Sequence, residues 1–202
     1  MPRPALTEEQ RRETRRKIRR AAAELYAQNG LADISARAIA ETAGVSVGTI
    51  YSYFENLTDL MQSLWKEPLG HFLVELGTIA EATPDPRKRL RRLLEAYVSF
   101  ALKQDAVYRG AFLFIRPGSQ EKPEPMDPEQ DRLFSLLKDT VAAGQKAGGF
   151  RRGNSRRITQ SLWAGLHGAI ALPTNIDRLA LEPPERAARH MVDLLMEWIE
   201  AP

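Results

Sequence analysis

Residues 36–54 read ARAIAETAGVSVGTIYSYF, and this stretch decides the fold of the N-terminal part of the chain. A helix-turn-helix needs a small residue where its two helices cross and a turn residue that tolerates a positive φ. Ala40 and Gly44 meet these needs, and Ser46 stands where the N-cap of the second helix belongs. Apolar residues occupy the positions that would face the core, namely Ile39, Ala43, Val45 and Ile50. The stretch therefore predicts a helix-turn-helix.

The same periodicity predicts which side chains of the second helix are exposed. They are Val47, Gly48, Thr49, Tyr51, Ser52 and Tyr53. In a DNA-binding helix-turn-helix, this face of the second helix enters the major groove. A helical hairpin within a bundle produces a similar pattern, so the spacing alone leaves both interpretations open.

The longer run from residue 34 to residue 60, ISARAIAETAGVSVGTIYSYFENLTDL, resembles the DNA-binding domain of the tetracycline-repressor (TetR) family. The resemblance covers about residues 12–66, and it includes Gly30 after the first helix and Asn56 before the fourth. Leu57 stands where the family usually has a lysine, so this chain departs from the family pattern at the start of the fourth helix.

The resemblance also implies which residues contact DNA. The phosphate-binding residues would be Ser35, Arg37, Thr49, Tyr51 and Tyr53, and those near base edges would be Val47, Gly48 and Ser52. Ser46, at the start of the second helix, completes the predicted DNA-binding site of nine residues. Such phosphate contacts fix the register on the duplex, whereas specificity would come from Tyr51, from apolar contacts and from DNA shape.

A basic run precedes this domain. Between Arg11 and Arg20 the chain has seven basic residues and one acid, Glu13. By itself, such a run usually forms a solvated helical face. The resemblance implies a second interpretation, in which a basic N-terminal extension reaches phosphates or the minor groove.

Prolines divide the chain, because proline inside a helix removes a backbone hydrogen bond and clashes with the preceding turn. The proline-free stretches are 5–67, 69–83, 87–116, 129–172, 174–182 and 185–201, and most of them have helical periodicity. We predict an all-α chain of about nine helices, with a loop over residues 116–128. Asn154 or Ser155 can cap the helix that begins near Arg156, and Pro184 falls in the first turn of the last helix. The predicted domains are residues 1–66, which bind DNA, and residues 67–202, which the resemblance assigns to effector binding and dimerisation.

Residues 162–168, LWAGLHG, resemble a Trp-x-x-x-His-Gly signature of one TetR subgroup. Small residues here would let another helix approach closely, and larger residues on the last helix would pack against them. Together they form the predicted dimer interface, a four-helix bundle from two chains, with Leu162, Gly165, Gly168, Ala169, Met191, Leu195 and Trp198. Packing of both helices within one chain is the alternative.

Trp163 and His167 are four residues apart and share one helical face. A predicted effector pocket combines them with aromatic residues of other helices, namely Tyr97, Phe100, Phe112 and Phe134. Such a cavity would be aromatic and mostly uncharged, which favours an apolar or aromatic effector. The alternative is that His167 is a core histidine with a satisfied hydrogen bond.

Composition excludes several classes of function. The 202 residues carry a net charge of only +3, and they include no cysteine, so disulfides, cysteine-ligated metals and thiol nucleophiles are excluded. His71, His167 and His190 are too far apart in sequence to suggest a metal site, and no catalytic motif is present. We predict no enzyme activity, no cofactor and no membrane span, and a cytoplasmic location.

These observations predict a homodimeric transcriptional repressor that binds a palindromic operator and releases it when a small molecule binds. Two alternatives are an effector-independent DNA-binding protein and a helical small-molecule binding protein or enzyme with an incidental basic N-terminus.

Overall fold

The computed structural model describes residues 7–29, 34–112, 126–176 and 178–200. Within these ranges the regular structure is helical, and the one β-type contact is an isolated bridge between Phe150 and Glu200. The predicted all-α class is therefore confirmed. The predicted helix end at Gly30 and most of the predicted loop 116–128 lie outside the described residues.

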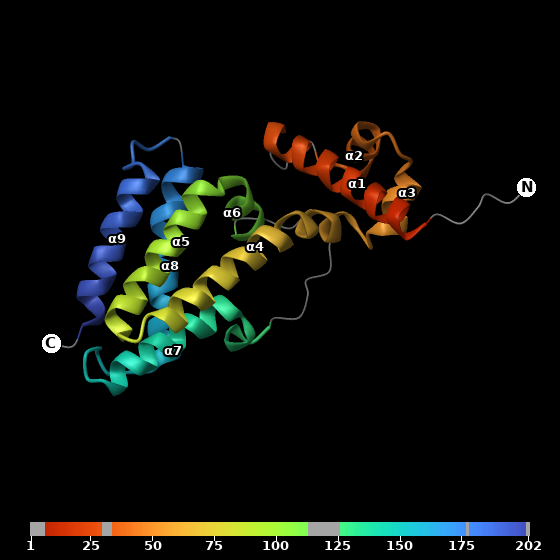
Figure 1. The fold of residues 1–202 in the computed structure, drawn as a ribbon. Coiled ribbons are helices and arrows are strands. Elements are labelled where there is room, and N and C mark those ends of the chain that lie inside the picture. The colour runs from red at the N-terminus through yellow and green to blue at the C-terminus, as the bar shows by residue number, and fades with distance from the viewer. Residues whose placement is uncertain (1–6, 30–33, 113–125, 177, 201–202) are drawn as a thin grey trace, which may run out of the picture. The chain divides into compact units, whose positions relative to one another are not determined.

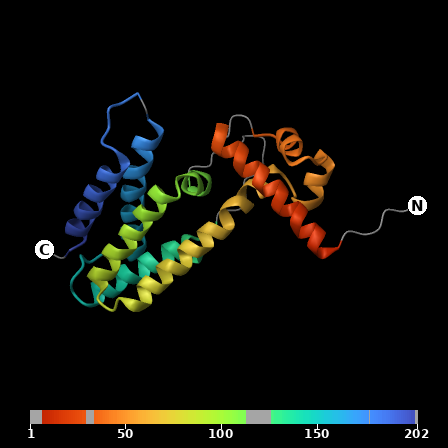
Figure 2. The same cartoon turned by 45° about the horizontal axis from the view of Figure 1, so that its top comes forward.

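The chain forms two compact units, of which the first comprises Met1–Pro68 and Gly110–Arg116. It contains α1 (Glu8–Asn29), α2 (Ala36–Ala43) and α3 (Val47–Tyr53), which Figures 1 and 2 show packed together in red and orange. Helix α1 begins with a reciprocal cap, in which Thr7 N–H donates to Gln10 Oε1 and Gln10 N–H donates to Thr7 Oγ1. Three isoleucines, Ile18, Ile39 and Ile50, are fully buried and form the core of this unit.

The second unit comprises Leu69–Arg109 and Pro117–Pro202. Its helices include α5 (Pro86–Lys103), α7 (Arg132–Lys146), α8 (Ser155–Asn175) and α9 (Pro184–Ile199), with a short 3-10 turn, η1 (Pro128–Gln130), before α7. Helix α5 packs against α7, α8 and α9, and α8 packs against α7 and α9, as Figures 1 and 2 show. Helix α6 (Asp105–Phe112) follows α5 directly and crosses the boundary between the units.

The N-termini of α5, α7 and α8 are capped by side-chain oxygens of Asp85, Asp131 and Asn154. The Asn154 cap, in which Oδ1 accepts a hydrogen bond from Arg157 N–H at 3.0 Å, confirms one of the two predicted caps for this helix. Pro184 is the first residue of α9, as the sequence predicts, because its missing N–H would have no partner there.

Two predicted helix breaks are wrong. Helix α4 (Leu57–Ala82) continues through Pro68, and α8 continues through Pro173 to Asn175. An interior proline costs about 3 kcal/mol, but α4 buries large apolar side chains on both sides of Pro68, each worth about 1.5–3 kcal/mol. These side chains are Leu60, Met61, Leu64, Trp65, Phe72 and Leu76. Pro173 lies two residues from the end of α8, where few backbone hydrogen bonds follow it.

The turn after α7 closes the second unit. A Cβ on Gly144 would lie only 2.0 Å from the Phe150 ring, so the ring packs directly on the helix backbone. Arg151 N–H then donates to the Ile199 carbonyl at 2.8 Å, which fixes the end of α9 beside this turn.

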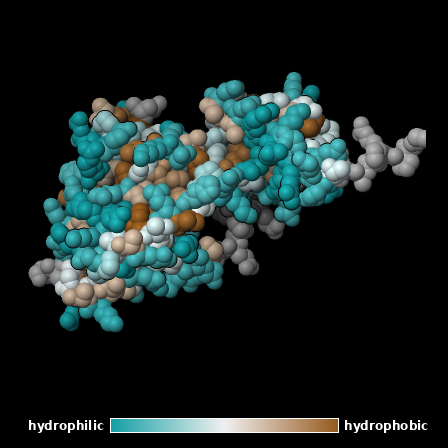
Figure 3. All heavy atoms as spheres, viewed as in Figure 1, coloured by the Kyte–Doolittle hydropathy of each residue, from teal (hydrophilic) through white to brown (hydrophobic). Residues whose placement is uncertain are grey.

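Figure 3 shows apolar residues gathered on one face of the second unit and bordered by hydrophilic ones. No helix within the described residues is long and apolar enough to span a membrane.

Candidate functional site

The turn between α2 and α3 has the local geometry that the sequence predicts. Ser35 Oγ accepts a hydrogen bond from Ala38 N–H at 3.1 Å and caps α2. Gly44 is left-handed, with a φ of 61°, and its N–H donates to the Glu41 carbonyl. Ser46 Oγ then accepts from Thr49 N–H at 3.0 Å and caps α3. Two side-chain caps and one glycine therefore set the angle at which α3 leaves the turn.

Helix α3 buries Ile50 and exposes its opposite face. Tyr51 is 51% exposed, and Val47, Gly48 and Ser52 are also exposed. The Ser46 and Thr49 hydroxyls lie 2.8 Å apart, and Ser52 Oγ donates to the Thr49 carbonyl at 2.7 Å. The exposed face therefore presents hydroxyl, phenol and apolar groups, with no arginine or amide that would read a base in a bidentate way.

All nine predicted DNA-binding residues lie in the first unit, at the start of α2, in the turn or on α3. Four of them line an open groove of about 960 Å³, namely Ser46, Thr49, Ser52 and Tyr53. The opposite wall comes from α1 and includes Arg11, Arg12 and Arg15, which the predicted site did not contain. The basic run was the signal in the sequence, but its spacing alone did not show that it faces α3.

The junction with α4 shows what the departure from the family pattern does locally. Asn56 Oδ1 accepts a hydrogen bond from Asp59 N–H at 2.9 Å and caps α4. Leu57 is the first residue of this helix and is half-buried. An apolar side chain at this position cannot donate a hydrogen bond to a phosphate.

A second candidate site lies within the second unit, where three polar side chains from three helices meet. Tyr97 of α5 and Tyr108 of α6 place their hydroxyls 2.9 and 2.8 Å from His167 Nδ1 on α8. The two tyrosine rings are edge to face, with centroids 6.0 Å apart. Tyr97 is 2% exposed and Tyr108 is fully buried. His167 is half-buried, and the low dielectric around the two buried tyrosines strengthens the hydrogen bonds of the cluster.

Burial shifts the pKa of each member of this cluster toward its neutral form. Desolvation raises the pKa of Tyr97 to about 12, and it raises the pKa of Tyr108 further above its usual value of 10.0. Desolvation lowers the pKa of His167 below 6.5. The cluster is therefore an uncharged, hydrogen-bonded group at neutral pH.

The structure brings only part of the predicted effector pocket together. Tyr97 bonds to His167, and Phe100 and Phe134 are buried in the same unit. Trp163 is half-buried on α8, whereas Phe112 belongs to the first unit.

Tyr108, the closest partner of His167, was missed as a pocket residue. The apolar stripe of Val107, Tyr108 and Ala111 on α6 was the available signal.

The predicted interface residues of α8 and α9 fall into two groups. Leu162 is fully buried within the chain, and a Cβ on Gly165 would lie 3.5 Å from Leu195 and 3.6 Å from Met191. A Cβ on Gly168, in contrast, would meet no described atom within 4 Å. Ala169 is half-buried, Trp198 is 38% exposed, and its exposed neighbour Leu194 was not in the predicted set. Packing within one chain thus occupies Leu162 and Gly165.

Comparison with protein families decides the identity of the chain. The model for bacterial regulatory proteins of the tetR family matches residues 18–64, and the model for a tetracyclin repressor-like C-terminal domain matches residues 90–195. The chain belongs to the tetR family. It is a DNA-binding transcriptional regulator, and regulators of this family bind operator DNA as dimers.

Two related regulators match different lengths of this regulator. The fatty acid metabolism regulator protein of Bacillus subtilis (strain 168) is 25% identical over 145 residues, which are 72% of this chain and 75% of the relative. The HTH-type transcriptional regulator AcrR of Shigella flexneri is 34% identical over 91 residues, which are 44% of this chain and 41% of AcrR. These relatives are transcriptional regulators.

Solved structures share the fold of this regulator. A protein described as a transcriptional regulator from Saccharomonospora viridis, in complex with choline, has a TM-score of 0.71 at 22% identity and covers 95% of this chain and 100% of its own. FadR from Bacillus subtilis, in complex with stearoyl-CoA, has a TM-score of 0.67 at 21% identity and covers 91% and 98%. At these identities the likeness concerns the fold.

We predict that His167 makes the stability of the regulator depend on pH. Because its pKa is lowered in the folded state, the unfolded chain binds its proton more tightly. The contribution of His167 should be complete above pH 6.5 and lost as the pH falls toward the lower, folded pKa. Urea unfolding across this range should show a smaller loss for His167→Gln than for wild type. His190→Gln, at an exposed site on α9, is the control, and equal losses in all three proteins would contradict the prediction.

Proposed function

We propose that this regulator is a cytoplasmic repressor that binds a near-palindromic operator as a homodimer and releases it when an apolar or aromatic molecule binds. In this proposal residues 1–66 bind DNA, and residues 67–202 bind the effector and dimerise. The observation that carries it is the exposed face of α3, which Ser46 caps and Ile50 anchors beside a groove of hydroxyl and guanidinium groups. We propose neither enzyme activity nor a resident cofactor.

The proposed contacts of α2 and α3 are mostly to phosphates. Ser35, Arg37 and Tyr51 are exposed, and Thr49 and Tyr53 line the groove. Hydroxyl and guanidinium donors bind the backbone well, and each neutralised phosphate releases counterions. Val47, Gly48 and Ser52 would lie nearest the base edges, where apolar contact and DNA shape supply specificity.

Arg37→Ala should weaken binding to a selected operator and to a random duplex by similar factors, because a phosphate contact carries no sequence information. The slope of log K against log salt should become shallower by about 1.8, because each of the two protomers loses one contact worth about 0.9. Fluorescence anisotropy at several salt concentrations measures both quantities. Arg186→Ala is the control, since Arg186 is exposed on α9 and forms only a surface ion pair with Glu182. An unchanged affinity and slope for Arg37→Ala would remove this residue from the proposed site.

The proposed dimer uses the outward faces of α8 and α9. Gly168 has open space where a side chain would stand, and Leu194 and Trp198 are 46% and 38% exposed. A glycine beside exposed apolar side chains lets a second helix approach closely. Met191, Leu195 and Ala169, which are half-buried, would complete the interface, whereas Leu162 and Gly165 would support it from within the chain.

Light scattering of the wild type should give twice the 22.7 kDa mass of one chain. Gly168→Leu should reduce this mass toward that of one chain, because the Cβ at this position meets no described atom of its own chain within 4 Å, whereas the side chain would block the partner helix. Gly70→Leu on α4 is the matched control, since its Cβ also meets no atom within 4 Å. A wild-type monomer at micromolar concentration, or a Gly168→Leu dimer of unchanged stability, would refute the proposed interface.

The proposed effector site surrounds the cluster of Tyr97, Tyr108 and His167. The rings of Phe72 and Phe100 are stacked, with centroids 4.2 Å apart, and the centroids of the Phe72 and Tyr97 rings are 6.3 Å apart. The surroundings of the cluster are therefore aromatic. An uncharged, aromatic environment favours a ligand with a large apolar surface and few polar groups. Release of DNA requires that this ligand bind more tightly to a conformation that does not fit the operator.

The second candidate function is an effector-independent DNA-binding regulator. The observation that favours it is the short hydrogen bonds that His167 Nδ1 forms with two buried tyrosines. In that case the cluster would only specify the core packing of the second unit. Operator binding that no compound alters would support this candidate.

We expect hydrophobic compounds that carry an acyl chain or an aromatic ring to release the wild-type protein from a selected operator duplex in an anisotropy assay. The double variant His167→Ala, Trp163→Leu should need a higher concentration of the same compound, while its affinity for the duplex stays unchanged. His190→Ala is the control, because His190 is exposed on α9. Release by a sugar or a divalent metal ion, or equal release of the double variant, would refute the proposed pocket.

A further inference from the structure

Helix α1 concentrates positive charge that its own acids neutralise only in part. Arg12, Arg16 and Arg20 pair with Glu8, Glu13 and Glu24 on the same helix. In the described part of the chain, no carboxylate lies within ion-pair distance of the remaining basic residues of the run, namely Arg11, Arg15, Lys17 and Arg19. The pairs that do exist are exposed and weak. The helix therefore retains a local positive potential that the net charge of the whole chain, +3, does not reveal.

Two of these residues face the DNA-binding helix. Arg11 and Arg15 are four residues apart, so they share one side of α1 and are separated by roughly 6 Å along its axis. Both line the groove whose other wall carries Ser46, Thr49 and Tyr53. In Figures 1 and 2 the N-terminal half of α1 lies beside α3, and Figure 3 shows this unit as mostly hydrophilic.

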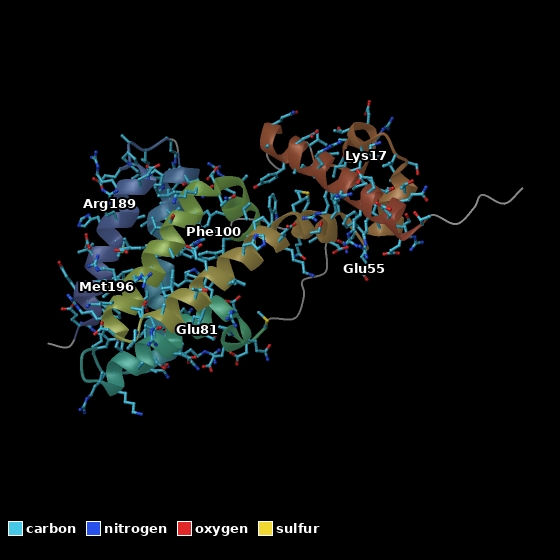
Figure 4. The ribbon with its side chains drawn as sticks, viewed as in Figure 1. Lys17, Glu55, Glu81, Phe100, Arg189 and Met196 are labelled. Carbon is cyan, nitrogen blue, oxygen red and sulfur yellow. The ribbon has the colours of Figure 1, made fainter. Side chains whose placement is uncertain are left out.

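The groove has a net positive charge. Its three arginines stand against one carboxylate, that of Glu8, which lies 3.8 Å from Arg12 and is paired with it. Lys17 is not among the lining residues of the groove, and its Nζ lies 3.6 Å from where a Cβ of Gly44 would stand, beside the negative end of the α2 dipole. Figure 4 labels Lys17 on α1 in this unit. Two charges, those of Arg11 and Arg15, thus remain for a bound anion.

The position of Arg15 is fixed by packing. Its guanidinium carbon lies 4.7 Å from the centroid of the Phe54 ring, which is buried at the C-terminus of α3. A guanidinium stacked on an aromatic face keeps its N–H donors at the edge and loses little entropy when they bind an acceptor. The same ring therefore ends α3 and orients a cation beside it.

We propose that Arg11 and Arg15 bind the sugar-phosphate backbone of one DNA strand, which lies in the groove between α1 and α3. This inference rests on the proposed DNA binding by α3 and adds a second row of phosphate contacts to it. We choose DNA as the occupant because the groove continues the surface of α3 that is already proposed to bind phosphates through its hydroxyls. A polyanion that contacts one wall must pass the guanidinium groups of the other.

The test compares two double variants with equal changes of charge. Arg11→Gln, Arg15→Gln removes the groove pair, and Arg16→Gln, Arg20→Gln removes two ion-paired arginines at the same spacing on the same helix. The probe is a duplex that the wild type selects from a random-sequence pool. For the groove pair, the slope of log K against log salt should become shallower by about 3.6, or about 0.9 for each of two contacts in each of two protomers, and the control should change much less. The preference for the selected duplex over a random one should stay the same in both variants.

Neutral methylphosphonates, placed one at a time in the selected duplex, test the same contacts from the DNA side. A methylphosphonate at one or two positions of each half-site should weaken binding by the wild type. The same substitutions should not change binding by the Arg11→Gln, Arg15→Gln variant. If the double variant does not fold, Arg11→Gln alone provides the comparison, because Arg11 is exposed.

The outcomes separate this inference from the proposed function. A wild type that selects no duplex would overturn DNA binding itself. A wild type that binds, together with equal slopes for the two double variants, would overturn only the role of α1. A third outcome is that the two double variants have equal salt slopes on DNA, but only Arg11→Gln, Arg15→Gln loses binding to anionic phospholipid vesicles. That outcome would assign Arg11 and Arg15 to a membrane surface and would also overturn the inference.

Discussion

Burial of one isoleucine from each of the first three helices is the interaction on which the DNA-binding unit depends. Ile18, Ile39 and Ile50 are fully buried, and each such side chain contributes about 1.5–3 kcal/mol. Helices α2 and α3 have 8 and 7 residues, too few to be stable alone in water. Their conformation therefore depends on packing, and burial of Ile50 determines which face of α3 remains exposed.

The same core also organises the charges of α1. Phe54 ends α3, is buried with the isoleucines, and places the Arg15 guanidinium at the edge of the groove. The charge of this surface therefore differs from that of the whole chain, since a chain with a net charge of +3 still presents a strongly basic helix beside α3. Acids on α1 pair with Arg12, Arg16 and Arg20 and leave the charge of the other basic residues of this helix without an ion pair among the described residues.

The second unit solves a different physical problem, which is how to bury polar side chains in an apolar bundle. Tyr97, Tyr108 and His167 come from three helices and satisfy one another, as buried polar groups must. Figure 4 marks Phe100 and Met196, two of the buried side chains of α5 and α9 in this bundle. At the proposed effector site, a ligand that displaced these hydrogen bonds would contact the same atoms that hold the three helices together.

Short-range interactions were readable from the sequence. The caps at Ser46 and Asn154 and the left-handed turn at Gly44 were predictable because each depends on residues no more than four positions away. Helical periodicity predicted the all-α class for the same reason. The predicted helix breaks at Pro68 and Pro173 were wrong. A proline costs the helix a backbone hydrogen bond, but packing of the neighbouring side chains offsets this cost, and the sequence pattern does not show that packing.

Only the tertiary structure decided the contacts between distant helices. Arg15 lies on Phe54, Tyr108 bonds to His167, and Gly165 faces Leu195 of its own chain. Residue type and periodicity place each of these on a helix face, but they do not say which other face it meets. That choice is made by the packing of whole helices, in which many apolar contacts are satisfied together and any single pair contributes little to the outcome.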